Sequence, residues 1–421
     1  MPMTLAKNTL PDNVHQGRLD RQTGIIVFLA FASAYFCSAL VRAITATLSP
    51  VLTHDFALHA RDLGLLAGGY FLGFAAVQLP LGTWLDRHGP KRVILYFLSL
   101  AVLGCLAFSF ASSFAWLMAA RVLVGMGVGA CLMAPLTGYR RWFDAATLLR
   151  ANSWMLMTGS LGMLASTLPV QWLMPLTGWR PLFWILAAMI LLSMVAIAWL
   201  VPNWDVAPTL VASPPPPQQA SYAEIWKGRY FQKMAPLAFF NYGGLLAVQT
   251  LWAGPWMVRV AGYTPLESAT GLFYINGAML LTFWSWGMVN LWLVRHGWSA
   301  ERLIGWGIPL SLVVLALNIL AGAWTGWLGW ALFCMASTVM GLAQPAVGMA
   351  FRAELAGRAL SAYNLLIFVG VFVVQWSIGL LIDAFAALGL AQVASFQAAM
   401  AVFLCCCITS YGYFLSVKVD N

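Results

Sequence analysis

The sequence predicts an all-α membrane protein with twelve transmembrane helices in two halves of six helices each. Hydrophobic residues make up 62% of the 421 residues and charged residues only 8%, whereas a soluble domain carries about 25% charged residues. Apolar stretches of about 20 residues recur along the chain, each long enough to cross a hydrocarbon core. A proline-rich segment near the middle divides these stretches into two sets.

The apolar stretches define the predicted spans. The first six are 24–51, 62–85, 93–112, 114–138, 151–174 and 181–201. The second six are 231–258, 269–294, 303–322, 327–351, 359–384 and 395–417. The third and ninth spans are short and only just reach the spanning length.

The domain organisation follows from the segment between the sixth and seventh spans. We predict an N-terminal half at residues 1–202, a cytoplasmic linker at 203–230 and a C-terminal half at 231–421. The linker contains Ser-Pro-Pro-Pro-Pro-Gln-Gln at 213–219, which is too polar to insert into a membrane and too stiff to pack as a helix. Residues 221–233 predict a short interfacial helix that leads into the seventh span.

The basic residues predict the orientation. Of the 22 lysines and arginines, only Arg61, Arg180 and Arg259 fall in the loops of one side, and Arg42 and Arg121 lie within spans. The others lie on the opposite side, which the positive-inside rule places in the cytoplasm. We therefore expect both termini in the cytoplasm and a monomer in the inner membrane of a bacterium. The net charge of +9 reflects this topology and does not indicate a nucleic-acid partner.

Arg42 and Arg121 are the charged residues near the middle of predicted spans, and no Asp or Glu accompanies them there. Burying an arginine at this depth costs roughly 2.5 to 3.5 kcal/mol, so such a charge indicates a functional site unless a partner explains it. The two helices run in opposite directions, which places both arginines roughly 8 Å to the outer side of the centre. A guanidinium binds a carboxylate, sulfonate or phosphate through two parallel hydrogen bonds. The missing countercharge therefore predicts an anionic ligand.

Polar residues follow one face of the first span. Tyr35, Ser38, Arg42, Thr45 and Ser49 recur at intervals of three or four residues, which is the spacing of one helix face. Further candidates for substrate contact in spans seven, ten and eleven are Tyr242, Gln249, Trp252, Gln344 and Asn364. For these residues the alternative is hydrogen bonding between helices without ligand contact.

The loop after the second span carries the most specific motif. It reads Gly82-Thr-Trp-Leu-Asp86-Arg87-His-Gly89-Pro-Lys91-Arg92. Gly82 permits close approach of another helix, and Asp86 can cap a helix N-terminus. The pattern, at this place in a chain of twelve spans, resembles the signature of the major facilitator superfamily.

We interpret this motif as a conformational gate formed by Gly82, Asp86, Arg87, Gly89, Lys91 and Arg92. Asp86 is expected to act on the region 352–358 before the eleventh span. The alternative is that the basic residues only set the topology and that Asp86 is solvated. The second half repeats the motif in degraded form, because Leu291 and Trp292 occupy the Asp-Arg positions.

The fourth span carries a second resemblance. Residues 117–129 are similar to the superfamily pattern Leu-x-x-x-Arg-x-x-Gln-Gly-x-Gly, with Val124 where glutamine is usual. Two pairs of small residues, Gly125 with Gly129 and Gly69 with Gly73, predict close helix contacts. The resemblance also leaves Arg121 two interpretations, one as a ligand contact and one as a structural or coupling residue.

The resemblance implies a secondary transporter whose site lies near the bilayer midplane between the halves, lined by spans one, four, seven and ten. With the arginines, this favours a small organic anion, such as a carboxylate, sulfonate or organic phosphate, as substrate. The alternatives are an exporter of drugs or other amphipathic compounds and a membrane sensor that does not transport.

The spans hold no nucleophile with a base, so we expect no enzyme. The seven cysteines lack metal-ligand spacing, so we expect no cofactor. Proton-coupled symport is one expectation, but Asp62, Glu267 and Asp383 lie only at outer helix ends. Uniport and exchange therefore remain open.

Overall fold

Helices form almost all of the described chain, and no strand occurs in it. A computed structural model describes residues 19–203 and 222–417. The polyproline stretch 213–219 lies outside these ranges, as do the first 18 residues. The helices before this gap are called the first group below, and those after it the second group.

Capping side chains start several helices of the first group. Asp20 accepts hydrogen bonds from the backbone N–H groups of Gln22 and Thr23, and Ser113 and Asp144 cap two later helices in the same way. The helices are α1 (Arg21–Phe56), α2 (Ala60–Ser109), α3 (Phe114–Val128), α4 (Met133–Trp142), α5 (Ala145–Ala165), α6 (Leu168–Thr177) and α7 (Trp179–Leu200).

The second group begins with a short helix from the predicted linker. This group consists of α8 (Tyr222–Lys227), α9 (Arg229–Pro236), η2 (Leu237–Tyr242), α10 (Gly243–Ala247), η3 (Val248–Trp252), α11 (Ala253–Arg259), α12 (Pro265–Arg295), α13 (Ala300–Ala321), η4 (Gly322–Thr325), α14 (Gly326–Ser337), η5 (Thr338–Leu342), α15 (Ala343–Met349), α16 (Ala353–Ala387) and α17 (Gln392–Ser416). The segments η2 and η3 are π-helical turns, and η4 and η5 are 3₁₀ turns.

Eight helical segments of the described chain are long and apolar enough to cross a membrane. Two of them, Ala60–Ser109 and Ala300–Met349, each cover most of two predicted spans. The predicted spans 151–174 and 231–258 are divided among shorter helices and π-helical turns. The count of twelve therefore stays a prediction, whereas the all-helical membrane architecture is confirmed.

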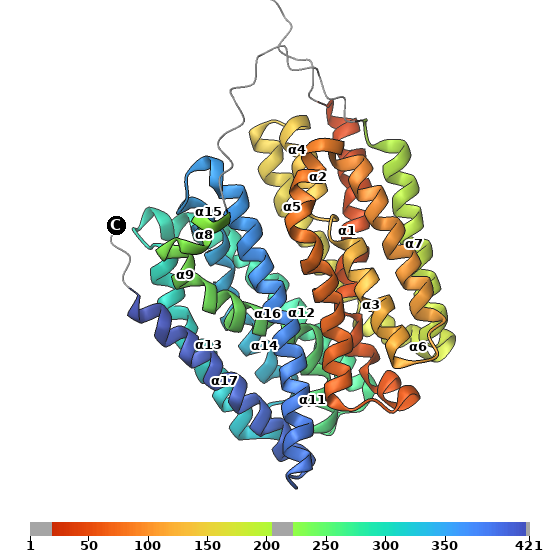
Figure 1. Cartoon of the computed structure of the whole chain (residues 1–421), viewed down its shortest axis with the longest axis vertical. Coiled ribbons are helices and arrows are strands. Elements are labelled where there is room, and N and C mark those ends of the chain that lie inside the picture. The colour runs from red at the N-terminus through yellow and green to blue at the C-terminus, as the bar shows by residue number, and fades with distance from the viewer. Residues whose placement is uncertain (1–18, 204–221, 418–421) are drawn as a thin grey trace, which may run out of the picture.

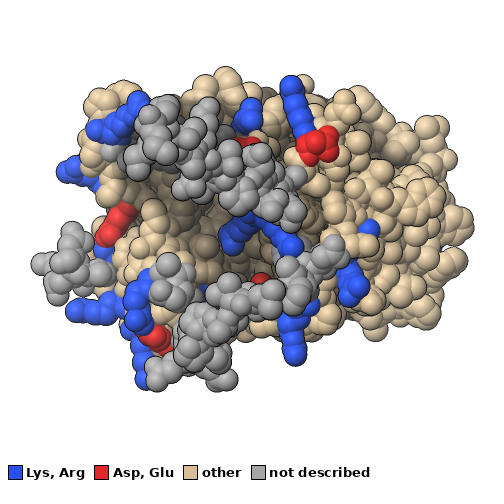
Figure 2. Space-filling view, turned by 90° about the horizontal axis from the view of Figure 1, so that it is seen from above, with Lys and Arg blue, Asp and Glu red and all other residues tan. Residues whose placement is uncertain are grey.

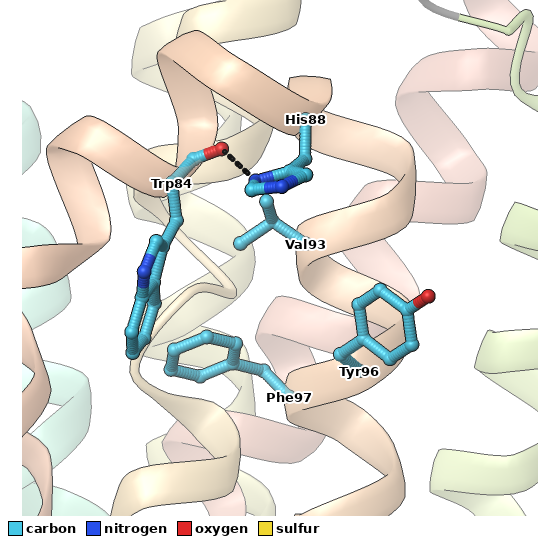
Figure 3. A pocket seen from close by; sticks show the side chains of 5 residues that line it. All are labelled: Trp84, His88, Val93, Tyr96 and Phe97. Atoms are coloured by element: carbon cyan, nitrogen blue, oxygen red, sulfur yellow. Dashed lines mark hydrogen bonds between the residues drawn. The ribbon is translucent and has the colours of Figure 1, made fainter.

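The long helix α2 is bent at Gly89, which has a φ of 75° and is followed by Pro90. A positive φ suits glycine because it has no Cβ, so Gly89 permits the reversal that separates two predicted spans. A pocket of about 250 Å³ lies beside this bend and is lined by Trp84, His88, Val93, Tyr96 and Phe97 (Figure 3). All of its lining residues come from α2, so the pocket does not join the two groups.

The glycines of α2 and α3 bring these helices into backbone contact. A Cβ added at Gly73 would lie 2.1 Å from the carbonyl oxygen of Val122, and one at Gly125 would lie 1.9 Å from that of Tyr70. Added Cβ atoms at Gly69 and Gly129 would also overlap neighbouring side chains. These contacts confirm the prediction that the paired glycines permit close helix packing.

The two groups are packed together at one end and separate toward the other (Figure 1). Near the start of α2, the backbone N–H groups of Ala60 and Arg61 bond to Asp383 of α16. At the opposite end, α4 makes its substantial contacts only with the first group, and α8, α9 and α15 only with the second. Figure 2 shows that this face is hollowed and that lysines and arginines surround the hollow. We call these ends the closed end and the open end.

Candidate functional site

Arg42 lies in the middle part of α1 and is partly exposed. Its guanidinium lies close to the phenol groups of Tyr35, on the same helix, and Tyr70, on α2. The Nε atom of Arg42 is buried and has no hydrogen-bond partner. Within the described ranges, no carboxylate pairs with this arginine. A buried donor of a charged group without an acceptor is costly, so the site is suited to an anionic ligand.

Residues of both groups meet at Arg42. Tyr242, in the π-helical turn η2 of the second group, interacts electrostatically with Tyr35 and with Arg42. Gly159 of α5 makes room for Tyr35, because a Cβ added there would lie 2.5 Å from the tyrosine ring. We call Tyr35, Arg42, Tyr70 and Tyr242 the central cluster. It brings together one guanidinium and three phenol groups, of which that of Tyr70 is fully buried.

Arg121 of α3 is bound by the protein itself. It is 1% exposed, and it donates to the carbonyl oxygen of Val41 at 3.0 Å and to that of Arg42 at 3.4 Å. It also donates to the hydroxyl of Thr45. Its guanidinium lies 5.3 Å from the centre of the Tyr70 ring, which is a cation–π distance. Arg121 therefore joins α3 to α1 beside the central cluster. Its two terminal nitrogens are occupied, and its Nε, like that of Arg42, has no hydrogen-bond partner.

Ser38 and Thr45 lie on the same face of α1 as Arg42. The hydroxyl of Ser38 is buried without a hydrogen-bond partner, and the hydroxyl of Tyr70 donates to its carbonyl oxygen at 3.4 Å. The hydroxyl of Thr45 accepts a hydrogen bond from Arg121. The polar stripe of the first span thus faces α2 and α3 in part, and Ser38 adds a second unsatisfied polar atom beside Arg42.

The candidates from the later spans are largely bonded to one another. Gln249 donates to the side chain of Asn276 at 2.9 Å, and Gln344 donates to that of Asn364 at 2.8 Å. Trp252 is fully buried, and its indole N–H donates to the carbonyl oxygen of a residue in α16, Gln375, at 3.1 Å. These bonds are the contacts between helices that the sequence left open as the alternative. They leave Tyr242 as the candidate from the second group that lies beside Arg42.

The predicted gate residues lie at the open end. Asp86, Arg87 and Arg92 are exposed, and Lys91 donates to the carbonyl oxygen of Val201 at 2.7 Å. A Cβ added at Gly82 would have no neighbour within 4 Å, so the expected close approach is not made in this conformation.

The expected contact of Asp86 with the region 352–358 is also not made. In the part of the chain that the structure describes, Asp86 forms no ion pair or hydrogen bond. Arg352 pairs instead with Glu224 of α8 at 2.9 Å. The gate assignment therefore stays a prediction.

Sequence reasoning missed Tyr70 and Asn276. Tyr70 is fully buried and contacts both intramembrane arginines. A tyrosine near the middle of an otherwise apolar span is the only signal that the sequence carried for it. Asn276, in the eighth span, bonds to Gln249. No group of three metal-ligating side chains occurs in residues 19–203 or 222–417.

The helical fold and the polar cluster between two helix groups define a membrane transporter. Residues 31–375 match the Major Facilitator Superfamily, and the chain belongs to this family. The chain is therefore a multi-pass membrane protein.

Known relatives are distant. The niacin transporter NiaP of Acinetobacter baylyi is 25% identical over 63% of this chain and 64% of its own length. The probable sulfoacetate transporter SauU of Cupriavidus necator is 24% identical over 54% of this chain and 56% of its own length. The aligned part thus spans less than two thirds of each. The multidrug resistance protein MdtL of Escherichia coli is 25% identical over 81% of this chain and 90% of its own length.

Solved structures agree with the fold. A bacterial homologue of the human lysosomal transporter Spinster superposes with a TM-score of 0.74 at 16% identity, covering 94% of this chain and 97% of that one. At this identity the likeness shows the fold alone.

Proposed function

We propose that the protein is a secondary active transporter that moves a small organic anion by alternating access. The observation that carries this proposal is Arg42. It is partly exposed in the central cluster, its Nε has no acceptor, and no described carboxylate neutralises it. An organic acid supplies both the missing acceptor and the missing charge.

The cluster also supports a ligand that carries more than its acidic group. The phenol groups of Tyr35 and Tyr70 lie close to the guanidinium, and that of Tyr242 lies within electrostatic range of it. Such rings pack against an apolar or aromatic body while the hydroxyls bond to its polar atoms. Two relatives are named as transporters of niacin and of sulfoacetate, which are both organic acids.

The topology belongs to the same proposal. We infer twelve spans, with both termini and the open end in the cytoplasm of a bacterium and with a monomer as the functional unit. The positive-inside bias supports this orientation. The lysines and arginines around the hollow in Figure 2 agree with a cytoplasmic face. In this orientation the structure is an inward-facing state.

A second candidate is export of amphipathic drugs. The likeness to MdtL, which extends over more of the chain than that to NiaP, favours it. An exporter of cationic drugs needs a carboxylate inside the cavity. In the described chain, no Asp or Glu lies beside Arg42, so an anionic or neutral drug fits better than a cation.

Ligand binding tests the proposal directly. The purified protein is reconstituted in nanodiscs, and its thermal stability is measured with nicotinate, sulfoacetate and benzoate, and with ethidium as a cation. We expect an organic acid to stabilise the protein. We expect Arg42→Gln to raise the dissociation constant about 10- to 100-fold, because a charge-assisted hydrogen bond contributes about 1.5–3 kcal/mol.

Arg259→Gln is the matched control. It removes the same charge from an exposed position at the closed end, so it should leave the affinity unchanged. If ethidium alone stabilises the protein, and does so equally in the Arg42→Gln variant, the proposal of an anionic substrate is refuted.

A further inference from the structure

Asp383 of α16 caps the first turn of α2, a helix of the other group. Its two carboxylate oxygens accept hydrogen bonds from the backbone N–H of Ala60 at 3.1 Å and from that of Arg61 at 2.9 Å. These N–H groups have no partner within their own helix, because they belong to its first turn. A carboxylate at a helix N-terminus is further stabilised by the helix dipole. The contact therefore joins the two groups by charge as well as by hydrogen bonds.

The backbones of α2 and α16 meet next to this contact. A Cβ added at Gly379 would lie 2.3 Å from the carbonyl oxygen of Ala60, and one at Gly64 would lie 2.4 Å from that of Gln375. Gly68 is packed in the same way against Phe372. The two helices thus touch without intervening side chains along the closed end. Small movements there break the capping bonds and the close packing together.

At the open end of the same two helices, the carboxylate is on α2 and the helix start is that of α16. They are antiparallel, so the last turn of α2 before Gly89, which bears Asp86, lies at the same end as the start of α16. Arg352 precedes the first residue of α16, and its side chain does not cap that helix. Asp86 is exposed and unpaired within the described ranges. Asp383 near the end of α16 and Asp86 just before the bend of α2 are therefore each placed to cap the N-terminus of the other helix.

We propose that Asp383 is the latch of the closed end and that it opposes the gate already predicted from the sequence at Asp86. In the state seen here, Asp383 caps α2 and the open end is free. In the opposite state, the Asp383 bonds break, the glycine contacts separate, and Asp86 caps α16. Each carboxylate stabilises only one state, so the two latches act in opposite directions on one equilibrium.

The neighbouring charges do not replace Asp383. Arg61 is mostly exposed and pairs with Asp62 at 3.6 Å, and Asp62 itself bonds to the backbone of His59 within the first group. Arg259 lines the same pocket as Asp383 but forms no ion pair in the described chain. Within the described residues, only Asp383 makes a charged contact with the backbone of the other group at this end.

A distance measurement between spin labels tests the proposal. The labels are placed by His54→Cys and Leu388→Cys, two exposed positions at the closed end of the two groups, in a background with Cys405→Ser and Cys406→Ser. The measurement uses the full chain in nanodiscs without substrate, so it does not depend on the proposed anion. We expect Asp383→Asn to raise the ratio of long to short distances roughly fivefold to thirtyfold.

Four further variants make the test specific. Asp86→Asn should lower the same ratio, and the double variant should lie between the single ones because distant sites add. Gly379→Ala, which overlaps Ala60, should raise the ratio as Asp383→Asn does. Glu267→Gln is the control. The carboxylate of Glu267 accepts a hydrogen bond from the backbone N–H of Thr264 within the second group, so this variant should leave the distance ratio unchanged.

An unchanged distribution in Asp383→Asn, or a shift of Asp383→Asn and Asp86→Asn in the same direction, would overturn the proposal. A failure of this kind leaves the anion-binding result of Arg42 untouched. The proposal rests on the proposed alternating access, but its measurement has a separate readout.

Discussion

Replacing each intramembrane arginine by lysine should separate a structural role from a binding role. Arg121→Lys keeps the charge but loses the fork that reaches Val41, Arg42 and Thr45 at once. A charge-assisted hydrogen bond contributes about 1.5–3 kcal/mol, and polar contacts within membranes lie at or below the low end of that range. If a lysine keeps one of the three bonds, the loss of the other two should lower the free energy of unfolding by about 2 to 3 kcal/mol.

Arg42→Lys should behave differently. The Nε of Arg42 has no protein acceptor, and its polar neighbours are tyrosine phenols. We therefore expect the free energy of unfolding to fall by less than about 1 kcal/mol, while anion affinity falls with the loss of two-point binding.

Unfolding in mixed micelles, followed by circular dichroism during an SDS titration, gives the free energies of both variants. Thermal stabilisation by an organic acid gives the affinities. The reasoning fails if Arg42→Lys is the more destabilised variant, or if Arg121→Lys keeps full stability and loses only the anion response.

The remaining predictions concern helix packing and a helix cap. Gly125→Ala places a Cβ 1.9 Å from the carbonyl oxygen of Tyr70, so α3 must move away from α2 by more than an ångström and Arg121 must lose its bonds to α1. We expect this variant to be strongly destabilised in the same SDS titration. Gly412→Ala is the control, because a Cβ added there has no neighbouring atom within 4 Å, and its stability should not change. Equal stability of the two variants would contradict the packing argument. Asp20 caps α1, and its hydrogen bonds to the side chain and backbone of Thr23 lower the pKa of that carboxyl below its ordinary value of 3.8. A lowered pKa stabilises the folded state above pH 3.8, and this contribution is lost as the pH falls from there through the lowered pKa of the folded state. Hydrogen exchange at the N–H groups of Gln22 and Thr23 should therefore become faster at low pH, and Asp20→Asn should weaken that change.

The candidate site was only partly predictable. The arginines were found because a charge in an apolar run is an energetic anomaly that composition alone reveals. Their roles separated only in three dimensions, where the terminal nitrogens of Arg121 proved to be bonded to α1, whereas Arg42 is partly exposed and lies near tyrosine phenols. Tyr70 was missed because a single tyrosine in an apolar span resembles ordinary packing.

The candidates of the seventh span were chosen by a spacing that the fold does not keep. Tyr242, Gln249 and Trp252 lie in or at the end of π-helical turns. A π-helical turn contains more residues than an α-helical turn, so the face expected from a regular helix is shifted. Trp252 is therefore buried against α16, while Tyr242 lies beside Arg42. No local pattern in the sequence predicts these turns.

The sequence by itself determined the membrane-embedded helical architecture and the family, because apolar length and a short loop motif depend only on neighbouring residues. The tertiary structure decided which polar groups are left without partners, because hydrogen bonds between helices depend on backbone contacts far apart in the chain. It also decided which end is closed. Asp383 and Ala60 are more than 300 residues apart in the chain, and nothing local in either segment specifies that they meet.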